Sequence, residues 1–268
     1  AQRNLPPHAA GLEFFPFFSG VQTQIVGGET VKTDVYAEKG IKHVTHVFGT
    51  DTLGRDQFAR TWTGTRVSLY VALLAILIDT FVGMSYGLVS GYFGGRVDFF
   101  LQRLVEILST IPTTVIVTLL IVVMKPGLAS ITIALMITEW IGMSRVARAQ
   151  TLRLKEQEFV LAARTLGEST PAVMFREILP NIFGQMVVMC MITIPNAIFT
   201  EAFLAFIGLG IPAPLASLGS LISDGFKSMT MYPYMVACPV VVLALLMLSF
   251  NLLADGLRDA FDPKMKEM

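Results

Sequence analysis

Three acidic residues lie within long apolar stretches of the chain, where an ionisable side chain needs a reason. They are Asp79, Glu139 and Glu201. A charged group at the centre of a bilayer costs ~2.5–3.5 kcal/mol on insertion scales. Either these carboxyls line a polar pathway or a proton site, or neighbouring helices satisfy them and burial keeps them neutral. Asn196 beside Pro195 is a further candidate for lining a pathway, because a proline frees a backbone carbonyl that water or a neighbour must satisfy.

Other residue types that support chemistry give no complete site. His43 and His46 could hold a metal, but no cysteine or carboxylate cluster joins them. Cys190 and Cys238 stand alone in apolar runs and suit packing. The sequence has no GxxxxGK[ST] loop for ATP and no HExxH motif. We therefore predict no metal site, no cofactor in this chain and no enzymatic activity of its own.

The composition indicates a membrane protein. Of the 268 residues, 53% are hydrophobic and only 15% are charged, and the mean hydropathy is +0.64. Soluble domains carry about 25% charged residues. The formal net charge is zero, which argues against a nucleic-acid partner. Charged residues are frequent up to Arg66 and rare in long stretches beyond it, so we place a change of solvent from water to lipid there.

Five apolar segments approach the ~20 residues that a helical span needs. They cover about 67–91, 107–124, 128–146, 182–207 and 234–253. The predicted fold class is therefore all-α, a polytopic membrane protein. Its predicted parts are an outer segment at 1–66, a transmembrane domain at 67–258 with a long loop at 145–180, and a tail at 259–268.

Lysine and arginine residues set the expected orientation. They gather in loop 145–180, in the turn after the first span and in the tail, so we place these parts in the cytoplasm and 1–66 outside. The chain begins with Ala1 on the outer side, so either a signal peptide was cleaved or a preceding span is absent from this sequence.

Loop 145–180 predicts a helix, a sharp turn and a second helix. Apolar residues from Phe159 to Leu166 have helical spacing, and Gly167 suits a helix C-cap. Ser169 or Thr170 followed by Pro171 predicts a second helix start. The small side chains of Ala162 and Ala163 would let the first helix press closely into a groove on another protein.

Several motifs in this chain resemble a known family. Leu161-Ala-Ala-Arg-Thr-Leu-Gly167 followed by Ile178-Leu-Pro-Asn181 resembles the EAA loop of permeases of binding-protein-dependent ABC transporters, with Leu161 in place of the motif's glutamate and Glu158 one turn earlier. Further stretches resemble one subunit type, the C type, of dipeptide, oligopeptide and nickel importers. They are 48–56, 64–69, 201–210 and 253–263, and the resemblance covers about 46–264.

The resemblance implies a subunit of an ATP-driven oligopeptide importer in a bacterial inner or plasma membrane, with a type I ABC importer fold. It favours a sixth span, preceding residues 1–66, that this sequence lacks. It implies a second, B-type permease, two ATPase subunits that hold ATP and magnesium, an extracytoplasmic substrate-binding protein and a peptide substrate. The helix at about 157–167 would couple to an ATPase cleft. The implied coupling residues are Glu158, Leu161, Ala162, Ala163, Arg164 and Gly167.

Two alternatives stay open from the sequence. In the first, the cargo is a dipeptide or nickel instead of an oligopeptide. In the second, the chain is a self-contained secondary carrier, and the absence of an inverted repeat argues against this alternative.

The sequence also predicts some local structure. We expect a short helix within Gly208–Pro233, capping and ion pairing by Asp51, Arg55 and Asp56, and pairing with Arg103 or contact with water for Asp98 and Glu106.

Overall fold

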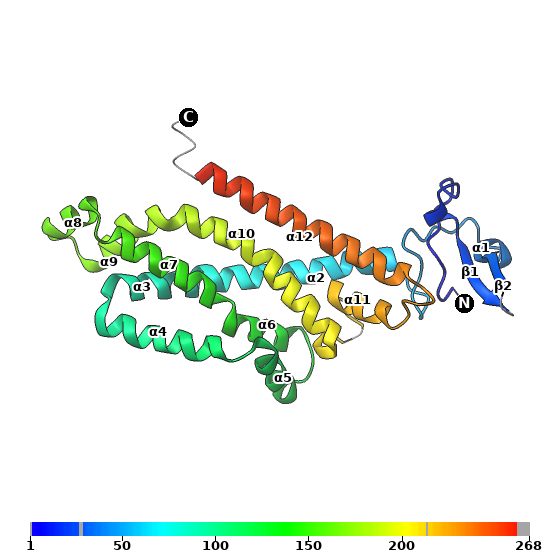
Figure 1. Cartoon of the computed structure of the whole chain (residues 1–268), viewed down its shortest axis with the longest axis horizontal. Helices are drawn as coiled ribbons and strands as arrows, with labels where there is room; N and C mark the ends of the chain where they lie inside the picture. Colours follow the sequence, from blue (N-terminus) through cyan, green and yellow to red (C-terminus); the bar gives the residue numbers. More distant parts are fainter. Residues whose placement is uncertain (1, 27–28, 213, 262–268) are drawn as a thin grey trace. The chain divides into compact units, whose positions relative to one another are not determined.

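The computed structural model describes residues 2–26, 29–212 and 214–261. They form two compact units, which are described separately (Figure 1). Unit 1 comprises Ala1–Ser68 and Ala202–Leu245, and unit 2 comprises Leu69–Glu201 and Leu246–Met268. Most of the predicted tail at 259–268 lies outside the described residues, which end at Phe261.

The outer segment in unit 1 contains the only strands among the described residues. β1 (Val21–Val26) pairs with β2 (Glu29–Asp34) in an antiparallel hairpin, and η1 (Pro16–Phe18) and α1 (Val35–Glu38) flank it. The expectation of an all-α chain is therefore wrong for this segment. Tyr36 of α1 is fully buried, stacks on His8 at 4.2 Å between ring centroids, and donates a hydrogen bond to the Pro6 carbonyl.

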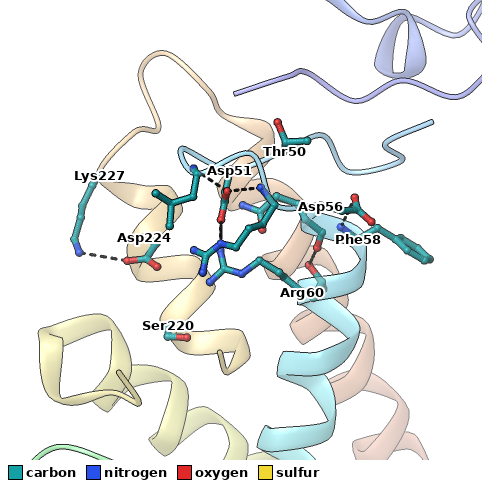
Figure 2. Close-up of polar contacts among 12 residues, drawn as sticks. Thr50, Asp51, Asp56, Phe58, Arg60, Ser220, Asp224 and Lys227 are labelled. Atoms are coloured by element: carbon teal, nitrogen blue, oxygen red, sulfur yellow. Dashed lines mark hydrogen bonds and ion pairs between the residues drawn. The ribbon is translucent and has the colours of Figure 1, made fainter. Parts of the chain in front are cut away.

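Asp51 and Asp56 organise the start of α2 (Gln57–Ile78), as predicted. Asp56 accepts the backbone N–H groups of Phe58 and Ala59, which caps the helix. The nearly buried Asp51 carboxylate accepts from Arg55 Nε and from Arg60 Nη1, both at 2.7 Å. Figure 2 shows Arg60 reaching from α2 toward Asp51. We call Asp51, Arg55 and Arg60 the Asp51 cluster.

A short helix, α11 (Leu218–Phe226), confirms the helix expected within Gly208–Pro233. Ser217 caps it in a reciprocal capping box with Ser220. α11 lies against backbone on two sides, because a Cβ at Gly219 would meet Ala202 and one at Gly225 would meet the Met235 carbonyl. The first half of α12 (Tyr234–Phe261) and the π-helical turn η4 (Ala205–Leu209) complete unit 1.

Unit 2 is a bundle of helices connected by short turns. It includes the part of α2 from Leu69 onward and the part of α12 from Leu246 onward. Its other elements are η2 (Asp79–Gly83), α3 (Met84–Phe93), α4 (Gly95–Thr110), α5 (Thr113–Met124), α6 (Leu128–Thr138), α7 (Trp140–Leu154), α8 (Glu158–Thr165), α9 (Thr170–Ala172), η3 (Val173–Ile178) and α10 (Leu179–Leu204, to Glu201 in this unit). Its core gathers buried side chains of α3, α7, α8, η3 and α10.

Three glycines at four-residue spacing, one at the end of η2 and two in α3, join these elements to α7. A Cβ on Gly83 would lie 2.7 Å from the Trp140 carbonyl oxygen, and one on Gly91 would lie 2.8 Å from that of Arg148. Gly87 between them has the closest backbone approach, to the carbonyl of Ser144. We call Gly83, Gly87 and Gly91 the glycine seam. Small residues allow this approach where helices associate in lipid.

The described residues contain three helical stretches long and apolar enough to cross a membrane, or four if one bent pair counts as a span. α4 and α5 form that pair and meet at 77°. The bend lies at Ile111 and Pro112, both with extended backbone, because a proline disfavours helical geometry in the residue before it. The segment predicted as a span at 107–124 is therefore broken.

Two ion pairs involve α4, and the sequence predicted the correct partner for only one of them. Arg103 pairs with Glu106, as expected. Asp98 instead pairs with Arg148 of α7, whose Nε donates to it at 2.6 Å, and Ser90 of α3 also donates to it. The expectation that Arg103 pairs with Asp98 is wrong, because α7 passes close enough to supply Arg148 as a bidentate partner.

Candidate functional site

The predicted helix–turn–helix is confirmed in loop 145–180. α8 begins after Gln157, whose backbone is extended, and Val160 is its fully buried anchor in the core of unit 2. The helix is held to the bundle on this one side. Most of its other side chains therefore stay available for contact.

Gly167 makes the turn after α8. Its φ of 82° lies in the left-handed region that favours glycine. Its N–H bonds the Arg164 carbonyl, and the Glu168 N–H bonds that of Ala163. Ser169 then takes the predicted N-cap position with extended backbone, although its side chain makes no capping hydrogen bond, and Pro171 lies in the first turn of α9 as predicted. This geometry presents α8 at one end of unit 2 (Figure 1).

A groove of about 580 Å³ runs beside α8. Apolar and small side chains line most of it, with two carboxylates at its edge; the lining residues are Phe159, Ala162, Ala163, Leu166, Gly167, Glu168 and Glu177. Of the predicted coupling residues, Glu158, Leu161, Ala162, Arg164 and Gly167 are exposed and Ala163 is half-buried. An exposed apolar patch of this kind is typical of a protein contact surface.

Asp79 lies inside unit 2, in the π-helical turn η2. Its side chain is 1% exposed, and its Oδ2 accepts a 2.6 Å hydrogen bond from the Thr193 hydroxyl of α10. Its Oδ1 has no hydrogen-bond partner among the described residues. π-helical turns are frequent at functional sites. The carboxyl is thus enclosed by the chain's own helices, and its predicted role in a pathway remains a prediction.

The other three candidates differ in exposure. Glu139 is half-buried where α6 ends and α7 begins, close enough to Asp79 for their charges to interact. Glu201 is fully buried. Asn196 is exposed on α10. Glu139 is therefore within electrostatic reach of Asp79, and Asn196 is the only one of the four that is exposed.

Two features of unit 2 were not identified as functional from the sequence. The glycine seam appears in the sequence as glycines at 83, 87 and 91, and this spacing was the available signal. The contacts that Lys155 and Tyr92 make near α8 carry no sequence signal.

The two cysteines, Cys190 and Cys238, are both buried, and their thiols are free.

The chain matches a protein-family model over residues 83–267, described as the binding-protein-dependent transport system inner membrane component. It is 47% identical over 222 residues to the oligopeptide transport system permease protein OppC of Bacillus subtilis (strain 168), covering 83% of this chain and 73% of that one. It is 44% identical over 265 residues to the dipeptide transport system permease protein DppC of Lactococcus lactis subsp. cremoris (strain MG1363), covering 98% and 76%.

The fold is also found in a solved transporter. A chain from inward-facing conformations of the MetNI methionine ABC transporter aligns with a TM-score of 0.63 at 17% identity, covering 76% of this chain and 98% of that one. At this identity the match shows the fold alone. The family model and the two relatives show that this chain belongs to the family of inner membrane components of binding-protein-dependent transport systems.

Proposed function

We propose that this chain is one of two membrane-spanning subunits of an ATP-driven peptide importer. The observation that carries the proposal is the exposed helix α8 with its apolar groove, in a chain that is 47% identical over 222 residues to an oligopeptide permease and 44% identical over 265 residues to a dipeptide permease. A B-type permease would supply the other half of the pathway, and an extracytoplasmic binding protein would deliver the peptide.

Loop 145–180 would then face the cytoplasm, residues 1–66 the outside, and the chain would cross the bilayer five times. Two ATPase subunits would bind ATP and magnesium and receive α8 in a surface cleft. Ala162 and Ala163 permit a close approach of helix to cleft, and Leu166 would lose its contact with water there. Closure of the ATPases would move α8 and, through it, the bundle.

The pathway itself would use polar groups of α10 and its neighbours. Asn196 is exposed and would face the space between the two permeases. Asp79, Glu139 and Glu201 would contribute if helix movement uncovers them. Oligopeptides are the proposed cargo, with dipeptides or nickel as the alternative, since the relatives include transporters of both peptide classes.

The test is a purification of the chain from cells that co-express the neighbouring transporter genes, followed by uptake of labelled peptide into liposomes. We expect a second permease and two ATPases to remain attached, and receptor with peptide to stimulate ATP hydrolysis. Ala162→Arg should abolish uptake by obstructing the groove. Thr165→Arg adds the same side chain to α8 outside the groove and is the control. A chain that purifies without an ATPase would refute the proposal.

A further inference from the structure

Two basic residues contact the last turn of α3, one before the start of α8 and one within α8. Lys155 follows α7 directly and donates from Nζ to the Gly91 carbonyl at 3.0 Å. Arg164 belongs to the last turn of α8, and its guanidinium carbon lies over the Tyr92 ring, 5.2 Å from the ring centroid. Two cations from the α8 region thus meet two successive residues of α3.

Tyr92 is a firm support for such a contact. Its side chain is only 7% exposed and packs in the same core as Val160, the buried anchor of α8. A cation placed over an aromatic face is attracted by the negative charge of the ring face. The ring is therefore held by the core, and the guanidinium of Arg164 covers its free side.

The end of α3 also attracts cations for a backbone reason. The last carbonyls of a helix have no intrahelical partner and carry a partial negative charge. α3 stops abruptly, since Gly94 and Gly95 both have positive φ, and the chain reverses there into α4. Asp98 of α4 also lies within electrostatic reach of Lys155, although Arg148 already pairs with its carboxylate. The α3 terminus thus offers Lys155 a backbone acceptor at Gly91, next to the Tyr92 ring on which Arg164 lies.

We propose that Lys155 and Arg164 are positioning residues that hold α8 against the end of α3 during transport. The inference rests on the proposed function and deepens it. α3 is joined to α7 through the glycine seam, so a displacement of α8 passes to a rigid helix pair and not only along the peptide chain. Arg164, although part of the exposed α8 motif, acts toward its own bundle.

The test uses the complete transporter in liposomes and measures peptide taken up per ATP hydrolysed. Arg164→Gln and Tyr92→Leu should each lower this ratio by about two- to fivefold, the range expected for an exposed cation–aromatic contact. The double variant should fall no further than either single one, because both remove the same contact. Tyr92→Phe keeps the aromatic ring and should therefore keep the wild-type ratio. Lys155→Met should lower it independently.

Arg153→Gln removes an exposed arginine of the same loop and is the matched control, expected to keep the wild-type ratio. Two results would overturn the inference. One is additive losses in the double variant. The other is a loss of ATPase subunits from the purified Arg164→Gln complex with no effect of Tyr92→Leu, which would place Arg164 against the ATPase. Wild-type chain that retains no ATPase would instead refute the proposed function.

Discussion

The glycine seam of unit 2 and the Asp51 cluster of unit 1 fix their helices by opposite means. At the seam, backbone meets backbone, and three residues contribute by having no side chain. In the Asp51 cluster, one nearly buried carboxylate gathers two arginines and the backbone N–H groups of Leu53 and Arg55. Side chains form the Asp51 cluster, whereas side chains at the three glycine positions would prevent the helix contact of the glycine seam.

This difference predicts different sensitivities. A seam of backbone contacts has no group that titrates and tolerates no added volume, so it suits helices that must move as one body. The Asp51 cluster depends on charge. Burial alone would raise the pKa of Asp51, but hydrogen bonds from Arg55 and Leu53 and the charge of Arg55 outweigh it and lower the pKa from 3.8.

The largest expected effect comes from filling the seam. Gly87→Leu should prevent assembly, because its side chain would meet the α7 backbone, which cannot shift without separating the helices. Size-exclusion chromatography of the co-expressed transporter would measure this. Gly142→Ala in α7 is the control, since a Cβ there has open space. Assembly of the Gly87→Leu chain at the wild-type level would contradict a rigid seam.

Removing the carboxylate of the Asp51 cluster should cost less. Asp51→Ala leaves Arg60, with a side chain only 14% exposed, without its hydrogen-bonded anion, and we expect a loss of about 3 kcal/mol of stability. Thermal unfolding of the purified complex would measure it. Lys42→Ala, which removes an exposed ion pair with Asp34 but leaves Asp34 as the cap of α1, should cost below about 1 kcal/mol. Equal losses would mean that the cluster is no stronger than a surface pair.

The pH dependence of hydrogen exchange should differ between the two units. Burial lowers the pKa of His46 from 6.5, and nearby His8 lowers it further, while Asp56 raises it in part. The folded state therefore favours neutral His46, and its contribution is present above pH 6.5 and lost as the pH falls through the folded pKa. Hydrogen exchange should speed up around residues 44–50 below that pH, after correction for intrinsic rates, but not in α3.

His46→Gln should remove most of this pH dependence, whereas the exposed His43→Gln should keep it. The same acid sensitivity in the His46→Gln chain would assign the effect to another group.

The smallest effect is expected at the α11 cap. Ser217→Ala removes the side-chain acceptor for the Ser220 N–H and should lower stability by about 1 kcal/mol. Exchange of the first amides of α11 would report it. Ser228→Ala, beyond the end of α11, should leave those amides unchanged. A cap effect as large as that of Asp51→Ala would break the ranking of the two kinds of contact.

Residues that begin or end helices made part of the fold predictable. Gly167, Ser169 and Pro171 fixed the turn between α8 and α9, and Asp51 and Asp56 marked the start of α2, because these residues act on backbone within a few positions. The β1–β2 hairpin was also signalled, by Gly27-Gly28 between two runs with strand character, but the segment was assigned no strands.

Contacts between distant parts of the chain could not be predicted in the same way. Asp98 finds Arg148 fifty positions away, and Gly87 finds Ser144, through helix packing that no local pattern encodes. The intramembrane carboxylates were recognised by their cost in lipid, but their neighbours, such as Thr193 for Asp79, follow only from the bundle.

Leu166, at the tip of the α8 turn, has a consequence for how the protein is made. Its side chain is 88% exposed beside an apolar groove. Under the proposed function, a newly inserted chain would present this surface to water until an ATPase subunit binds α8, and exposed apolar surface invites aggregation. Synthesis of the partner subunits in matching amounts would therefore protect the orphan chain, and a surplus of it would be a natural target for membrane quality-control proteases.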